Sequence, residues 1–96
     1  MLELRLNCEN CGQSLPNDSD QAMICSFECT FCLDCVQNIL ENTCPNCDGG
    51  FEKRPTRPQK LLLKYPSAIE LFHKPVDIIA FQKVLREYKN TDPRKR

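Results

Sequence analysis

The spacing of eight cysteines constrains this chain more than any other feature. All eight fall between residues 8 and 47 of a 96-residue sequence. Chains this short bury proportionately little surface, and many rely on disulfides, a metal or a partner for stability. The cysteines form four close pairs: Cys8–Cys11, Cys25–Cys29, Cys32–Cys35 and Cys44–Cys47. We therefore expect the fold to be held together around its cysteines.

The first residues bear on whether these cysteines form disulfides or bind metal. The segment MLELRLNC has neither the basic region nor the long apolar stretch of an export signal. This predicts a cytoplasmic location, where structural disulfides are rare. No apolar run reaches the roughly 18 residues that a membrane helix requires, so no membrane partner is expected. We predict metal binding, with a disulfide framework as the alternative.

Pairs of cysteines separated by two residues are typical of zinc sites, because a tight turn brings both sulfurs to one ion. Zinc takes four ligands in a tetrahedron, at about 2.3 Å for sulfur. Eight cysteines fill two such sites with none left over, which predicts two Zn²⁺ ions. Sites closed by four thiolates leave no position for a catalytic water. We find no nucleophile–base pair, phosphate-binding glycine loop or H-E-x-x-H motif, so the sequence predicts neither an enzyme nor a small-molecule substrate.

The cysteine pairs can be combined in two ways. In the cross-brace arrangement, site 1 uses Cys8, Cys11, Cys32 and Cys35, and site 2 uses Cys25, Cys29, Cys44 and Cys47. In the sequential arrangement, the first four cysteines bind one ion and the last four bind the other.

Local structure favours the cross-brace arrangement. Asp34 and Gln37 form a capping box that predicts a helix ending near Asn42. Cys35 then lies at the helix start, where the partial positive charge favours a thiolate. A knuckle pair and a helix-start pair together make a treble-clef site, and the stretch AMICSFECTFC forms a hairpin presenting Cys25 and Cys29. The sequential arrangement stays open as an alternative.

Charge and proline content divide the chain into three predicted segments. Residues 1–50 carry one cation against eight carboxylates, whereas residues 51–96 carry twelve cations against five, so the two halves should attract each other. We predict a two-zinc domain over residues 1–54 (the cysteine module). A basic, proline-containing linker follows over residues 55–66, and a helical extension over residues 67–96 (the C-terminal extension).

Periodicity predicts further elements. Leu2, Leu4 and Leu6 alternate with charged residues as in a short strand, and Leu61 to Leu63 are candidates to pack back onto the module. Ser67 and Glu70 form a capping box for a short helix ending at Lys74–Pro75. An amphipathic helix is predicted from Pro75 to about Lys89, with apolar residues three, four and seven apart: Ile78, Phe81, Val84, Leu85 and Tyr88.

The residues around the cysteines also resemble known families. The order of the pairs, the run ECTFCLDCV and the final CPNC resemble a RING finger, with Cys29 where the usual histidine stands. More closely, NCENCGQSLP, ICSFECTFCLDC, CPNC and the following RPTRP are similar to a family of short bacterial cysteine-rich proteins of unknown function, over roughly residues 1–75. The resemblance implies a small α+β zinc-stabilised domain with a RING-like, treble-clef fold of β-hairpin and short helix, followed by a helical extension.

Several functions are compatible with such a domain. We expect a structural zinc module that binds another protein. One alternative is a RING-type ubiquitin ligase, although Glu9–Asn10 and Asp48 depart from the residues usual in such RINGs and Pro45 alone agrees. Another is nucleic-acid binding through cations of the linker region: Lys53, Arg54, Arg57, Lys60 and Lys64.

Four further interpretations concern the cysteines as a set and individual aromatic and histidine residues. Cys29-x2-Cys32-x2-Cys35 followed by Cys44–Pro45 partly mimics an iron–sulfur run, but its last gap is too long. A redox or metal-relay role would require reactive thiols. We expect Phe27 and Phe31 in the core, and no ligand role for His73, because eight thiolates already fill both sites.

Overall fold

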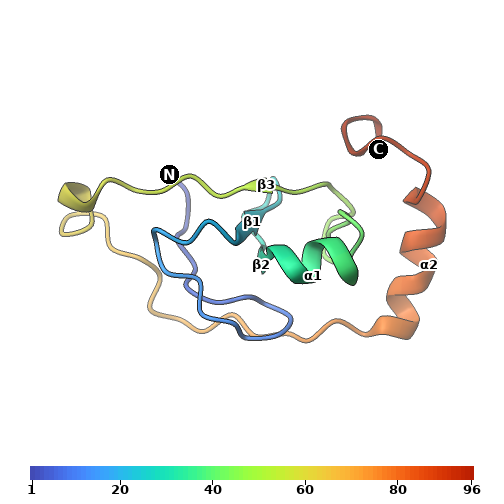
Figure 1. Cartoon of the computed structure of the whole chain (residues 1–96), viewed down its shortest axis with the longest axis horizontal. Helices are drawn as coiled ribbons and strands as arrows, with labels where there is room; N and C mark the ends of the chain where they lie inside the picture. Colours follow the sequence, from blue (N-terminus) through green and yellow to red (C-terminus); the bar gives the residue numbers. More distant parts are fainter.

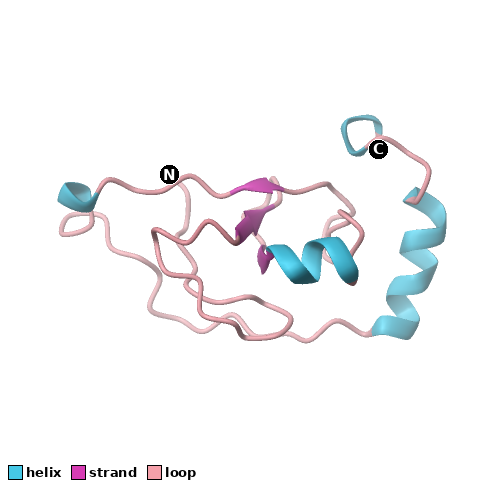
Figure 2. Cartoon of the chain, viewed as in Figure 1, coloured by secondary structure: helices cyan, strands magenta, loops and turns pink.

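A β-hairpin at the centre of the chain organises the fold. In the computed structural model, which describes residues 1–96, β1 (Ala22–Ile24) and β2 (Thr30–Cys32) pair antiparallel, with Met23 opposite Phe31. A short β3 (Glu52–Lys53) pairs with the other edge of β1, giving the order β2-β1-β3 (Figures 1 and 2). The predicted hairpin is confirmed, and it places Cys25 and Cys29 at its tip.

Helix α1 (Leu33–Asn38) follows β2 without a loop. Val36 and Leu40 are buried, so this segment turns an apolar side to the core. The predicted cap at Asp34 is wrong: the N-cap is Cys32, whose sulfur accepts a hydrogen bond from the Cys35 N–H. Because the strand runs directly into the helix, the first turn begins before Asp34 and a cysteine sulfur caps it. The helix ends at Asn38, earlier than predicted, and Glu41 and Asn42 beyond it have left-handed backbones.

The core is small and lies between the hairpin, α1 and the cysteines. Phe31 packs edge-on against Phe51, with ring centroids 5.5 Å apart, and Leu15 and Leu40 are fully buried beside the sulfurs. Phe31 is therefore a core residue as expected. The same expectation is wrong for Phe27, which is 71% exposed, because it lies in the turn between Cys25 and Cys29 and points away from the sheet.

The N-terminal residues and residues 67–77 lie side by side in extended conformations. The Ala68 N–H donates to Leu4 O (2.8 Å) and the Lys74 N–H to Glu9 O (2.8 Å). The short helix predicted from the Ser67–Glu70 box does not form, and the segment instead bonds to the N-terminal residues through the N–H groups of Ala68 and Lys74. Residues 2–6 likewise form no regular strand, although Leu4 is buried.

Arginine side chains join the second half of the chain to the first. Arg54 is buried and donates to three carbonyl oxygens, those of Arg5, Leu15 and Pro16. Arg57 donates to Leu2 O and Tyr65 O. The two ion pairs, Arg5–Glu3 and Arg94–Glu52, each join residues of the same half. No ion pair joins the acidic and basic halves, so the attraction expected between them is not expressed as salt bridges, and the arginine contacts go to backbone carbonyls instead.

Beyond the module the chain forms three short elements. Residues of η1 (Gln59–Leu61) lie at the far left of Figure 1. The expected packing of the leucines is wrong for Leu61 and Leu63, which are exposed, whereas Leu62 is half-buried. Helix α2 (Ile78–Tyr88) confirms the predicted amphipathic helix, and η2 (Pro93–Lys95) follows it.

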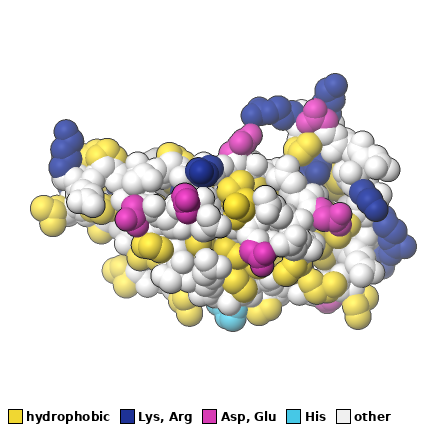
Figure 3. Space-filling model, in the orientation of Figure 1, with side chains coloured by type: hydrophobic (Ala, Val, Ile, Leu, Met, Phe, Trp, Pro, Cys, Tyr) yellow, Lys and Arg dark blue, Asp and Glu magenta, His cyan; other side chains and the backbone are white.

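Helix α2 stands across the opposite end of the molecule from η1. It begins with Asp77 as its N-cap and packs Phe81, its one buried residue, against the core of the module. Lys and Arg side chains gather on its outer side (Figure 3). No helix of the structure combines the length and apolar character needed to cross a bilayer.

Candidate metal centres

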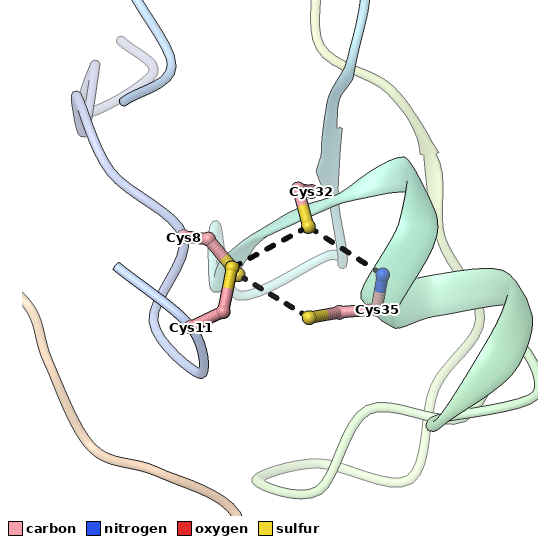
Figure 4. Close-up of side chains that lie close together, drawn as sticks. All are labelled: Cys8, Cys11, Cys32 and Cys35. Carbon is pink, nitrogen blue, oxygen red and sulfur yellow. Dashed lines mark hydrogen bonds between the residues drawn. The ribbon is translucent and has the colours of Figure 1, made fainter. Parts of the chain in front are cut away.

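The first cysteine cluster comes from two separate parts of the chain. Cys8 and Cys11 lie on the N-terminal loop, whereas Cys32 and Cys35 lie at the end of β2 and the start of α1 (Figure 4). The four sulfurs lie within 4.8 Å of one another. Cys8 and Cys35 are 3.8 Å apart and Cys11 and Cys32 are 3.7 Å apart, measured between Sγ atoms. These are the four residues that the cross-brace arrangement assigned to site 1.

The second cluster brings together Cys25, Cys44 and Cys47, whose sulfurs also lie within 4.8 Å of one another. Cys29, predicted as the fourth ligand, is buried at the other side of the hairpin tip but falls outside this limit. Its sulfur accepts a hydrogen bond from the Asn46 side-chain amide at 3.4 Å. The structure therefore groups three of the four residues predicted for site 2, with the fourth hydrogen-bonded to the loop that carries Cys44 and Cys47.

The first and last cysteine pairs are held by the same backbone pattern. The Gly12 N–H donates to Cys8 O, and the Cys8 N–H donates to Gln13 O. In the last pair, the corresponding bonds run from Asp48 to Cys44 and from Cys44 to Gly49. The residue after each second cysteine has a left-handed backbone, with φ of 80° at Gly12 and 67° at Asp48. These turns fix both sulfurs of a pair on one side of the loop.

Burial makes several of these thiols hard to ionise when no metal is present. Desolvation raises the pKa of Cys35 and of Cys44, and it also raises the pKa of Cys29 and Cys32. Cys8 is the exception: burial opposes ionisation, but backbone N–H groups led by that of Cys11 outweigh it, so its pKa is lowered. A cation is therefore needed to make a cluster of thiolates stable in this core.

Polar side chains that the sequence analysis missed surround both clusters. Asn10 donates its amide N–H to the Cys35 sulfur at 3.4 Å. Asn46 donates to the Cys29 sulfur and to the carboxylate of Glu9, which is buried. The signal for these roles was present in the sequence, since Glu9–Asn10 and Asn46 lie inside the C-x2-C pairs, where side chains stay close to the sulfurs.

The remaining candidate residues lie outside the clusters. His73 is exposed and lies near Gly12, in neither cluster. Of the five cations considered for phosphate binding, Arg54 and Arg57 direct their guanidinium groups at backbone carbonyls of the same chain. Lys53, Lys60 and Lys64 remain exposed.

These features define a small cysteine-rich protein in which a three-stranded antiparallel sheet and helices frame two cysteine clusters able to hold metal ions. The sequence model of the family described as "Protein of unknown function (DUF1272)" matches residues 1–57, and the chain belongs to this family. The expected resemblance to a cysteine-rich family of unknown function is thereby confirmed.

An uncharacterized protein of Rhizobium meliloti (strain 1021) is 53% identical to this chain over 75 residues, which cover 78% of this chain and 89% of the relative. No solved structure matches the chain significantly. The family model ends at residue 57, so most of the linker and the whole C-terminal extension lie outside it.

Proposed function

We propose that the chain is a structural zinc protein that holds two Zn²⁺ ions in cross-braced sites of four cysteines each. The observation that carries this proposal is the sulfur geometry of the first cluster. In a regular tetrahedron with Zn–S bonds of about 2.3 Å, the ligand sulfurs lie about 3.8 Å apart. The separations of 3.8 Å and 3.7 Å in the cluster agree with that value. All-thiolate ligands and tetrahedral spacing suit zinc better than magnesium or calcium, which prefer oxygen.

The second site is proposed from three clustered thiols and one neighbour. Cys25, Cys44 and Cys47 supply three ligands, and a small rotation at the hairpin tip would bring in Cys29. The donors from Asn10 and Asn46 support the assignment, since groups that hydrogen-bond to ligand atoms orient them and tune the metal. Together these ligands interleave along the chain, as in the RING-like treble clef that the sequence predicts.

Elemental analysis together with native mass spectrometry tests the metal content. Protein purified without added metal should contain two zinc ions per chain. Iron with acid-labile sulfide, or a mass lower by the hydrogens lost to disulfides, would overturn the proposal.

Paired substitutions test how the ligands are grouped. In the cross-brace arrangement, Cys11 and Cys35 share one ion, so replacing both by serine should leave one zinc. In the sequential arrangement the same two changes damage both sites. The matched control replaces Cys11 and Cys29 by serine, which reverses these expectations. One retained zinc in the control and none in the first variant would establish the sequential arrangement.

For the role of the zinc domain, we propose presentation of a protein-binding surface, with no catalysis at the metals. Four thiolate ligands per ion leave no open coordination position. The hairpin tip supports the interaction role, because Phe27 is 71% exposed between two proposed metal ligands, which would hold it rigidly in solvent. A Phe27→Ser variant should keep two zinc ions but lose its partner in affinity purification from the source cells. A Ser26→Ala variant is the matched control.

Nucleic-acid binding and ubiquitin-ligase activity have weaker support. Arg54 and Arg57 are engaged with backbone carbonyls, so the linker offers fewer free cations than its composition indicates. No specific feature of the structure favours ligase activity over the interaction role.

A further inference from the structure

Helix α2 is fastened at its start to the loop that carries the first cysteine pair. The Lys74 N–H donates to Glu9 O at 2.8 Å, and the Val76 N–H donates to the side-chain oxygen of Asn10 at 2.9 Å. Asn7 adds a bond to Phe72 O at 2.8 Å. Three hydrogen bonds thus hold residues 72–76 against the loop of the first cysteine pair, directly before α2 begins.

The segment after α2 is fastened to the loop that carries the last cysteine pair. Arg96 donates to Asn42 O at 3.1 Å and to Asp48 O at 2.9 Å, on either side of that pair. Pro93 lies so close to Gly50 that a side-chain carbon at residue 50 would be 2.6 Å from the proline ring. Glycine is therefore needed at this position for the tail to dock.

Between these anchors, α2 inserts Phe81 into the module. Phe81 is 4% exposed and belongs to the same core as the cysteines, with Val84 and Leu85 packed beside it. A cavity of about 250 Å³ lies beside this contact, between Ala80, Phe81 and Val84 on α2 and Glu9, Pro45 and Asn46 on the module. Phe81 is therefore the one fully inserted side chain of the helix, and the space next to it is open.

The anchoring residues also touch the sulfurs. Asn10 uses its oxygen to bind the Val76 N–H and its amide nitrogen to bind the Cys35 sulfur. Asn46, which lines the cavity under α2, donates to the Cys29 sulfur and to Glu9. The segment that contains α2 is thus linked to both cysteine clusters through residues that lie within or beside the cysteine pairs.

We propose that residues 72–96 form a metal-coupled strap, which docks when both cysteine clusters hold metal and in turn slows metal loss. This inference rests on the proposed zinc sites and adds a regulatory role for a segment outside the family match. Coupling between two binding events is reciprocal: if metal stabilises the docked strap, the docked strap must stabilise the bound metal by the same free energy. The strap then acts as a closure over both sites, and its release exposes Phe81 and the cavity beneath it.

The test compares Phe81→Asp with Ile79→Asp in the full zinc-loaded chain. Both place a carboxylate on α2, but Ile79 is 82% exposed, so only the Phe81 variant should release the strap. Excess chelating dye makes zinc dissociation rate-limiting, and with unchanged association a weaker affinity appears as faster dissociation. We therefore expect zinc transfer to become about tenfold faster for Phe81→Asp and to stay unchanged for Ile79→Asp. Hydrogen exchange should rise across residues 72–96 in the first variant alone. Equal transfer rates in the two variants would overturn the coupling.

A second pair of variants tests the link at the first cluster. Asn10→Ala removes the side chain that joins Val76 to the Cys35 sulfur, and we expect about tenfold weaker zinc retention with faster exchange at residues 72–78. Asn17→Ala is the control, because Asn17 binds Arg57 in the linker and touches no sulfur. If Phe81→Asp fails to fold, Arg96→Ala replaces it, with faster exchange expected in the tail and faster zinc transfer.

The outcomes separate the two proposals. Purified protein that contains no bound metal would refute the proposed zinc sites themselves. Two zinc ions per chain, together with transfer rates that no strap variant alters, would leave the sites intact and refute the coupling alone.

Discussion

The cysteine module and the C-terminal extension achieve their structures by different means. Nineteen residues are buried, and Phe81 is the only one of them beyond residue 54. The module places most of its cysteines inside its core, whereas the extension is attached by a few hydrogen bonds and by Phe81 with its partly buried neighbours Val76, Val84 and Leu85. We therefore expect the stability of the module to depend on what its sulfurs bind, and the docking of the extension to depend on the module.

Metal removal should produce the largest difference between the two regions. Each structural zinc contributes on the order of 10–16 kcal/mol in small zinc-finger peptides at neutral pH, which is as large as the whole stability of many domains. Thorough chelation should therefore unfold residues 1–54 and, with them, the docking site of α2. Circular dichroism and amide chemical shifts would follow the loss. A native-like spectrum with no bound metal would contradict this expectation, because the small apolar core would then be enough to keep the module folded.

Acidification should have the second-largest effect, and it should act on the module by weakening its affinity for zinc. Burial raises the pKa of Cys35 and Cys44, so these thiols hold their protons in the metal-free protein and zinc must displace them. Lowering the pH favours the thiol form, and zinc affinity should fall by about tenfold per pH unit for each proton displaced. Zinc release measured from about pH 7.5 to about pH 5 with a competing chelator would show this slope. A pH-independent affinity would contradict all-thiolate ligation.

Within the module, the free energy of unfolding should be sensitive to Arg54. Its buried guanidinium satisfies three carbonyl groups, and Arg54→Ala would leave them without partners, at a cost of about 3 kcal/mol. Lys53→Ala, at an exposed neighbouring position, is the control and should be close to neutral. Chemical denaturation of the zinc-loaded variants measures both. Similar stabilities would show that water replaces the guanidinium without penalty.

The smallest effect is expected within the extension itself. Asp77 caps α2 by accepting the Ala80 N–H at 3.2 Å, and Asp77→Ala should destabilise the helix by about 1 kcal/mol. The expected result is faster hydrogen exchange in residues 78–88 at unchanged zinc content. Asp77→Asn should retain most of the protection, because asparagine is also a good cap. Loss of zinc from Asp77→Ala would instead extend the coupling to the cap itself.

The sequence predicted the elements that depend on local pattern. The hairpin between Ala22 and Cys32 follows from cysteine spacing and apolar residues, and α2 follows from a periodic apolar face. The four sulfurs brought together around α1 are those expected from the treble-clef pattern, although their metal ligation stays a prediction.

The sequence failed where distant contacts override local preference. The Ser67–Glu70 capping box was a valid helix signal, but Ala68 hydrogen-bonds to Leu4 O, far away in the sequence. Cys32 is the N-cap of α1 in place of the predicted Asp34, because β2 leads into the helix without a loop. The burial of Arg54 could not be predicted either, since nothing adjacent to it in sequence shows that three carbonyl groups converge on its side chain.

The arginines after the last cysteine also set the order in which the chain can assemble. Arg54 binds Arg5 O across 49 residues, and Arg57 binds Leu2 O across 55. These bonds and the interleaved cysteine pairs join residues that are far apart in sequence, and contacts of that kind slow folding. During synthesis the carbonyl groups of Arg5 and Leu2 therefore lack these arginine partners until residues 54 and 57 have left the ribosome. Cys8 and Cys11 alone would supply only two of the four ligands of the proposed first site to an early metal ion. We therefore expect the module to complete its fold late and in one concerted step.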